Sequence, residues 1–161
     1  MKIKLVKINN ISGGLTSFYS VCYEPSEVTI FDEFCSQYRN TYGSQIREIN
    51  TRLLDMGTNM GANQFFFKPK RIKKGDNVCI LKEPHLTEMR LFCIKYGEKL
   101  VVLGGGGPKL KKIDSLASKN LLKKEQEKMS QISRLIDMKI QSGELEFSLN
   151  NMDFIGDFEL V

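Results

Sequence analysis

The sequence predicts an α+β fold in which an N-terminal strand or hairpin is followed by an antiparallel helical hairpin packed on a small antiparallel sheet, with an additional C-terminal helix and tail. Two observations predict it. Apolar residues recur at helical spacing in two early segments and one late segment, whereas the segments between them read as strands. The length of 161 residues suits one domain, with a core at residues 17–113 and a C-terminal helix and acidic tail at residues 114–161.

Six segments are expected to form strands. The first two, residues 1–8 and 17–23, are separated by the turn-like stretch NNISGG and predict a hairpin. The other four lie at residues 64–68, 78–82, 88–96 and 99–103. Gly97 and Glu98 join the last two by a tight connection, which predicts a second hairpin.

Two helices are expected between these groups of strands. Residues 29–42 carry apolar and aromatic side chains at helical spacing, and Thr29 with Asp32 resembles a capping box. Gly43 separates this helix from a second one, which ends at Gly57. The turn between them is short, so we expect the two helices to lie antiparallel.

The last part of the chain predicts a long amphipathic helix at residues 115–141 and a tail with the short strand-like segments LEFSL and FIGDFEL. From residue 144 onward there are five acidic residues and no basic one. We consider two hypotheses for residues 150–161. They either fold back over a basic face as a shield, or form a terminal strand that completes the sheet.

Positive charge is concentrated in the middle of the chain. The formal net charge is +5, yet residues 66–112 alone hold twelve Lys or Arg against four Asp or Glu. This distribution predicts a face that binds polyanions. The amino terminus lacks the unbroken apolar stretch of a signal peptide and no apolar run could span a bilayer, so a cytoplasmic protein with no membrane partner is expected.

The cysteines do not form a metal-binding pattern. No C-x-x-C pair occurs, and His85 is the only histidine. We therefore expect no metal and no other cofactor. The cysteines have apolar or aromatic neighbours and are expected to be reduced core residues: Cys22, Cys35, Cys79 and Cys93.

The stretch VVLGGGGPKLKK at residues 101–112 joins an apolar segment to four glycines and three lysines. It lacks the Gly-Lys-Ser/Thr ending of a nucleotide P-loop and the third glycine of G-x-G-x-x-G. We expect the glycines to end the strand and to permit a close approach, either by the protein's own packing or by the backbone of a ligand or partner. They are Gly104, Gly105, Gly106 and Gly107.

The order of these elements, with RLFCIKYGEKLVVLGGGGPKLKK on the late strands, resembles the RelE/ParE superfamily of toxins from bacterial toxin–antitoxin systems. The element order resembles the family over residues 17–140, and the sequence over residues 88–112. The resemblance implies a concave basic face over the sheet. It also implies one of two activities: metal-free endoribonuclease cleavage of messenger RNA, usually on the ribosome, or inhibition of DNA gyrase. In both cases a cognate antitoxin protein is the implied partner.

Arg90 and the lysines after the glycines match the family's basic positions. Arg90 matches the central arginine, whose fork of donors suits the oxygens of a phosphate in cleavage. Lys109, Lys111 and Lys112 match the basic stretch, where a lysine among other cations can act as general base while its neighbours hold phosphates. An ordinary edge arginine and a solvated lysine face are the alternatives.

A second basic stretch precedes the late strands. Its members are Lys68, Lys70, Arg71, Lys73 and Lys74. We expect this loop to flank the same groove and to contact nucleic-acid backbone without sequence specificity. The alternative is a solvated loop with no ligand.

The chain departs from several nucleases of the family, which use a late histidine or tyrosine as general acid. No histidine follows His85 and no tyrosine follows Tyr96. We expect His85 to be a bystander in a turn and Tyr96 to be a packing residue. The leading interpretation is therefore a messenger RNA endoribonuclease that relies on arginine and lysine. A toxin that inhibits gyrase without catalysis and a basic nucleic-acid-binding protein of the same fold are the alternatives.

Overall fold

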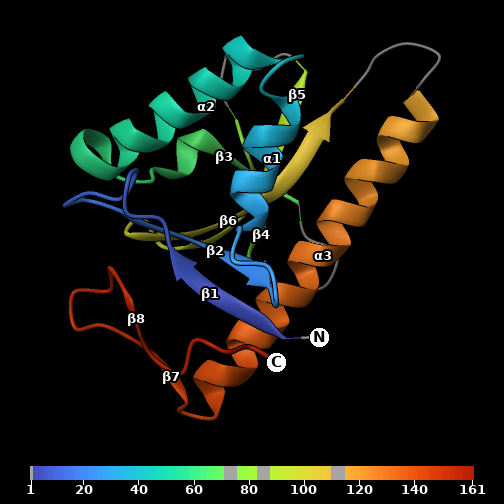
Figure 1. Ribbon diagram of the computed structural model, residues 1–161. Helices are drawn as coiled ribbons and strands as arrows, with labels where there is room; N and C mark the ends of the chain where they lie inside the picture. Colours follow the sequence, from blue (N-terminus) through green and yellow to red (C-terminus); the bar gives the residue numbers. More distant parts are fainter. Residues whose placement is uncertain (1, 71–75, 83–87, 110–114) are drawn as a thin grey trace.

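The computed structural model describes residues 2–70, 76–82, 88–109 and 115–161. The chain forms an α+β fold built on a six-stranded sheet (Figure 1). In order across the sheet the strands are β1 (Ile3–Lys7), β2 (Ser17–Tyr23), β6 (Leu100–Pro108), β5 (Met89–Tyr96), β4 (Val78–Leu81) and β3 (Phe67–Pro69). A 3-10 turn, η2 (Gln64–Phe66), leads into β3.

The sheet is mixed, which corrects the prediction of a purely antiparallel sheet. β2 and β6 run parallel, with Phe18 opposite Val101, while every other pair of neighbouring strands is antiparallel. The reason lies in the connections. β1–β2 and β3–β6 are two separate antiparallel units, and no tight turn joins β2 to β6, so a hairpin does not dictate their relative direction.

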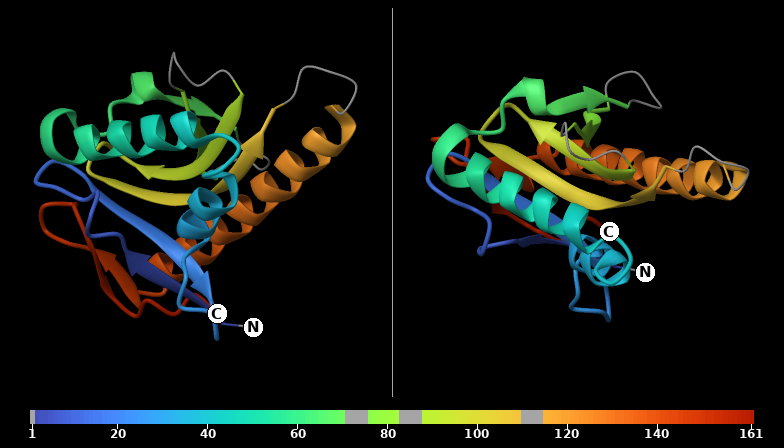
Figure 2. Two further views of the ribbon diagram at one scale, coloured as in Figure 1. Left: turned by 45° about the horizontal axis from the view of Figure 1, so that its top comes forward. Right: turned by 90° about the horizontal axis from the view of Figure 1, so that it is seen from above.

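Helices cover both faces of the sheet: α1 (Ile30–Tyr38) and α2 (Gly43–Asp55) lie on one face, and α3 (Ser115–Gln141) lies on the other (Figure 2). α2 continues into a π-helical turn, η1 (Met56–Met60). Thr29 caps α1, because its hydroxyl oxygen accepts a hydrogen bond from the backbone N–H of Asp32 at 3.1 Å. This contact confirms the predicted helix start.

The first two helices differ from the predicted antiparallel pair. Figures 1 and 2 show the axis of α2 turning steeply away from that of α1. Each helix buries its own apolar stripe in the core on this face of the sheet, with Phe31 and Phe34 from α1 and Ile49 and Leu53 from α2. Packing on the sheet thus sets their directions more than the short turn between them does.

The alternation of side chains along the strands divides the core in two. Phe18, Leu91 and Leu103 pack on the α1 and α2 side, whereas Tyr19 and Val102 pack on the α3 side. From α3, the apolar residues Met129, Ile132 and Ile136 are fully buried. All four cysteines are buried and free, as the sequence predicts.

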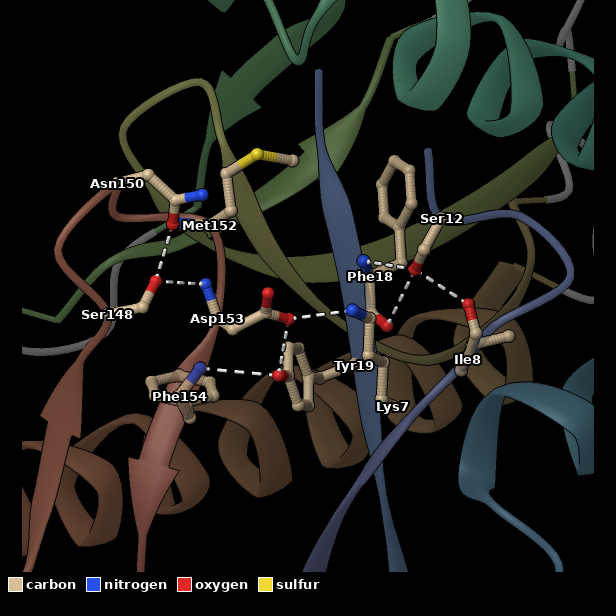
Figure 3. A network of polar contacts seen from close by, with 10 residues as sticks. All are labelled: Lys7, Ile8, Ser12, Phe18, Tyr19, Ser148, Asn150, Met152, Asp153 and Phe154. Atoms are coloured by element: carbon tan, nitrogen blue, oxygen red, sulfur yellow. Dashed lines mark hydrogen bonds and ion pairs between the residues drawn. The ribbon is translucent and has the colours of Figure 1, made fainter. Parts of the chain in front are cut away.

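The C-terminal segments form a hairpin of β7 (Leu145–Phe147) and β8 (Phe154–Gly156), held to β2 by Tyr19 (Figure 3). The Tyr19 hydroxyl donates to Asp153 Oδ1 at 2.8 Å and accepts from the Phe154 N–H at 3.2 Å. Lys7 Nζ lies 2.8 Å from the same carboxylate oxygen. The hairpin is therefore anchored by a polar network as well as by aromatic packing.

The chain ends alongside β1. The Leu5 N–H donates to the Phe158 oxygen at 2.9 Å, and the Leu160 N–H donates to the Ile3 oxygen at 2.7 Å. The tail thus behaves as a terminal strand segment at the outer edge of the sheet. The hypothesis that residues 150–161 shield the basic face is wrong. Residues 158–160 lie along β1 and Asn150 contacts Lys99 beside the β5–β6 turn, whereas the basic face lies toward the β3 edge.

Candidate nucleic-acid interface

A cleft of about 410 Å³ lies between the β3 edge of the sheet and the N-terminal half of α3. Strands β3 and β4 form one wall and α3 forms the other. Seven cationic side chains line it: Lys68, Lys70, Lys82, Arg90, Lys109, Lys119 and Lys123. The lining residues that the structure describes include no Asp or Glu, so the cleft has an unbalanced positive charge.

Apolar side chains complete the lining of this cationic cleft. They are Ile80, Leu81, Phe92 and Leu122. Ile80 and Phe92 belong to the core between the sheet and α3, where both are at least nine-tenths buried. The cleft therefore combines a rigid apolar floor with charged ends of long, adaptable side chains.

Arg90 and Lys109 reach the cleft from adjacent strands. Arg90 pairs with Gly107 in the β5–β6 ladder. The ladder continues past β6, because the Lys109 N–H donates to the Glu88 oxygen at 2.6 Å. The two side chains are thus diagonal neighbours on one face, a separation that long side chains can bridge. The structure brings these two predicted site residues together.

Arg90 is half-buried, and its Nη1 donates to the Met89 carbonyl at 3.1 Å. It forms no ion pair within the described ranges. The remaining donors of its guanidinium group are therefore not used by an acidic partner there. Such a fork of donors at the edge of a cationic cleft suits a phosphate oxygen pair.

A β-bulge lies beside Arg90. Leu91 pairs with Gly106 but Cys93 pairs with Leu103, so β6 has one more residue than β5 over this interval. A bulge bends its strand and redirects nearby side chains. β6 continues through the glycines to Pro108 instead of ending at them, which corrects the predicted strand end.

The four glycines are buried by the protein's own elements. A Cβ atom added at Gly104 would collide with Met129 of α3, and one at Gly106 would collide with the Arg90 carbonyl. At Gly107 it would lie 2.8 Å from Leu121. Of the two expectations for Gly104, Gly105, Gly106 and Gly107, the structure supports packing. The approach of a ligand or partner backbone is not supported, because α3 and the β5 backbone occupy that space.

Some lysines of the two basic stretches predicted from the sequence line the cleft. Lys68 and Lys70 line it, and so does Lys109. The other predicted members lie outside the described residues: Arg71, Lys73, Lys74, Lys111 and Lys112. His85 lies outside them as well.

Four polar lining residues were not predicted: Lys82, Lys119, Lys123 and Gln126. Three of these come from α3, where Lys119, Lys123 and Gln126 follow each other at four- and three-residue intervals and therefore share one helical face. This spacing was visible in the sequence. Without the structure, however, the charged side of α3 reads as a solvated face.

Tyr96 is a packing residue, as expected, and does not line the cleft. Its ring centroid lies 5.5 Å from that of Phe147 and 5.8 Å from that of Phe154. Burial raises the pKa of the Tyr96 hydroxyl.

Two further properties concern the described part of the chain as a whole. No cluster of three or more His, Cys, Asp or Glu side chains there could hold a metal ion. None of its helices has both the length and the apolar character required to cross a bilayer.

Comparison with known proteins gives no match: no family model, no curated protein and no solved structure matches the chain significantly. The function must therefore be argued from the cleft itself.

Proposed function

We propose that the chain is a metal-free endoribonuclease of the RelE/ParE toxin type that cuts messenger RNA in the cationic cleft. The observation that carries the proposal is the convergence of seven cationic side chains, Arg90 among them, on one cleft whose described lining contains no acid. The cations of such a cluster repel one another, and binding a polyanion offsets this repulsion.

The arrangement of the two walls favours single-stranded RNA as the ligand. Both walls of the cleft carry lysines. Lys68 and Lys70 lie on the β3–β4 wall, and Lys119 and Lys123 lie on the α3 wall. The phosphates of a single RNA strand can therefore be contacted from both sides. The apolar floor offers contact to an unpaired base, which a base-paired duplex would not present.

The cleavage step uses the 2′-hydroxyl of the RNA. Its oxygen attacks the adjacent phosphorus, the bond to the 5′-oxygen breaks, and the products are a 2′,3′-cyclic phosphate and a 5′-hydroxyl end. Arg90 stabilises the charge on the pentacoordinate phosphate. A lysine amine such as that of Lys109 accepts the 2′-hydroxyl proton, and a lysine ammonium protonates the leaving oxygen.

In this proposal the protein acts in the cytoplasm on messenger RNA bound to the ribosome. A cognate antitoxin silences it. Acidic side chains of the antitoxin would suit the cationic cleft, because they can occupy the positions of the RNA phosphates.

A second candidate function is nucleic-acid binding without catalysis. The observation that favours it is the chemistry of the lining, which includes no His, Tyr, Asp or Glu among the described residues. Lysine and arginine are both charged at neutral pH as free side chains, so they bind phosphates more readily than they transfer protons.

The test is to induce the chain in bacterial cells and to map messenger RNA 5′ ends by primer extension, with Arg90→Ala in parallel. The nuclease predicts new 5′ ends that disappear in the variant. Growth arrest without new ends would indicate a toxin with another target, such as gyrase. If neither growth arrest nor new 5′ ends appear, the remaining interpretation is a protein that binds nucleic acid without catalysis.

A further inference from the structure

Three side chains on α3 connect the two walls of the cationic cleft. Gln126, Ser130 and Ser133 follow each other at four- and three-residue intervals, so they lie on one face of the helix. All three make hydrogen bonds to the chain that forms or adjoins the β3–β4 wall. We call this row the clasp.

The first two members of the clasp hold two different points of that chain. Gln126 Nε2 donates to the Lys70 carbonyl at 2.9 Å, just after β3. Ser130 Oγ donates to Asp76 Oδ2 at 2.9 Å, just before β4. Since Lys70 and Asp76 flank residues 71–75 in the sequence, α3 holds the chain on both sides of that segment.

The third member continues the row toward β4. The Asn77 N–H donates to Ser133 Oγ at 3.4 Å, and the Val78 N–H donates to Asp76 Oδ1 at 3.2 Å. Asp76 and Ser130 are each 3% exposed, and Ser133 is fully buried. Buried polar groups are costly to leave unpaired, so these contacts fix one position of α3 against the wall.

The β3–β4 wall depends on such support. β3 has three residues and is the last strand of the sheet, so it pairs with β4 alone. A short edge strand of this kind has little stability of its own. Yet this wall carries three lysines of the cleft, Lys68, Lys70 and Lys82.

We infer that the clasp positions the β3–β4 lysines for the nucleic acid, so that Ser130 and Ser133 control affinity although neither lines the cleft. The inference rests on the proposed function, because it assigns these residues a part in RNA binding. When Ser130 loses its hydroxyl, Asp76 loses a hydrogen-bond donor in a buried site. The wall then moves relative to α3, and the lysines on the two walls no longer reach the same phosphates together.

The test compares two serines whose hydroxyls both form hydrogen bonds, Ser130 to a buried carboxylate and Ser12 to backbone groups. Ser130→Ala removes the clasp's hydrogen bond to Asp76. Ser12→Ala removes a serine in the distant β1–β2 connection, whose hydroxyl donates to the Ile8 oxygen at 2.7 Å and accepts from the Phe18 N–H at 2.8 Å. Affinity for a single-stranded 2′-O-methyl RNA oligonucleotide, which cannot be cleaved through a 2′-hydroxyl, is measured at several salt concentrations well below either melting temperature.

We expect Ser130→Ala to weaken binding about three- to tenfold, the range for removal of one hydrogen bond. The slope of log affinity against log salt should fall by about 0.7 for each phosphate that the variant no longer binds. Lys70→Ala should weaken binding less in the Ser130→Ala background than in the wild type, because the two changes disturb the same interactions with RNA. Ser12→Ala should lower the melting temperature and leave affinity and slope unchanged.

Two results would overturn the inference, and they differ. If the wild type binds the oligonucleotide and Ser130→Ala changes only the melting temperature, the clasp has no part in binding and the proposed function stands. If the wild type itself does not bind, both the proposed function and the inference are wrong.

Discussion

Arg90 on β5 lies directly opposite Gly107 on β6, so β6 presents no side chain at the position facing the arginine. The same glycine lets Leu121 of α3 approach the strand, because an added Cβ would come within 2.8 Å of it. One position thus keeps a β6 side chain away from Arg90 and admits the helix that forms the second wall of the cleft.

Arg90→Ala is expected to reduce RNA cleavage about 100- to 1,000-fold, the effect of removing one donor that stabilises charge in a transition state. Binding of uncleavable RNA should weaken far less, because six other cations remain in the cleft. Cleavage rates under single-turnover conditions and separate binding titrations measure the two effects. Arg90→Lys keeps the charge but not the fork of donors, and equal activity of Arg90→Lys and wild type would contradict the assigned role.

Lys123 and Lys124 form a matched pair on α3. Lys123 lines the cleft, whereas Lys124 lies on another part of the helix surface, near Tyr23. Lys123→Ala should weaken RNA binding at low salt and lower the salt slope by about 0.7, as expected when one phosphate of a single strand is no longer bound. Lys124→Ala should change neither quantity. Equal effects of the two substitutions would mean that RNA does not bind in this cleft.

Gly106→Ala is expected to destabilise the fold by about 1–3 kcal/mol or more, because the new Cβ would meet the Arg90 carbonyl and backbone cannot easily move away. Gly14→Ala is the control, since no atom lies within 4 Å of its added Cβ. Urea unfolding of both variants measures the difference. Wild-type stability of Gly106→Ala would show that β6 does not pass this close to β5.

Tyr19→Phe tests the anchor of the C-terminal hairpin. The ring can keep its packing on Phe154, 5.0 Å away between centroids, but the variant cannot form the hydrogen bonds to Asp153 and from Phe154. We expect a decrease of about 1–2 kcal/mol in the free energy of unfolding. RNA affinity should not change, because this network lies far from the β3 edge. A change in RNA affinity would show that the C-terminal hairpin influences the cleft.

Low pH should weaken the same anchor of the C-terminal hairpin, which includes Asp153. Burial raises the pKa of Asp153, but the hydrogen bonds from Lys7 and Tyr19 and the charge of Lys7 lower it more, so the folded pKa lies below the usual value. The group therefore stabilises the fold above its unfolded pKa of about 3.9, and this stabilisation disappears as the pH falls through the folded pKa. The carboxylate side chain is 36% exposed, so the effect is small.

The measurement is the difference in unfolding free energy between the wild type and Asp153→Asn. This difference should shrink between about pH 5 and pH 2. A difference that does not depend on pH in this range would show that Lys7 and Tyr19 do not stabilise the charged carboxylate.

Local pattern predicted much of the fold. The spacing of apolar residues located α3 at residues 115–141, and the Thr29 cap located the start of α1. The parallel pairing of β2 with β6 was not predictable in this way, because it joins segments about eighty residues apart with no turn between them. The steep turn from α1 to α2 also depends on how each helix packs on the sheet.

The candidate site was predictable in part for a similar reason. The sequence singled out Arg90 and Lys109 from neighbouring strands. It did not reveal Lys119 and Lys123, because a lysine on the cleft and a lysine in solvent have the same helical spacing. It also left two functions open for Gly104, and the position of Met129 on α3 decides in favour of packing.

The most direct measurement of the central claim uses the purified protein with a 5′-labelled single-stranded RNA in the presence of a metal chelator. We expect fragments that end in a 2′,3′-cyclic phosphate. Arg90→Ala should form them about 100- to 1,000-fold more slowly, and none should form at positions where the RNA carries a 2′-deoxyribose. RNA that is bound with steep salt dependence but stays intact, both free and on ribosomes, would contradict cleavage and leave a nucleic-acid-binding protein.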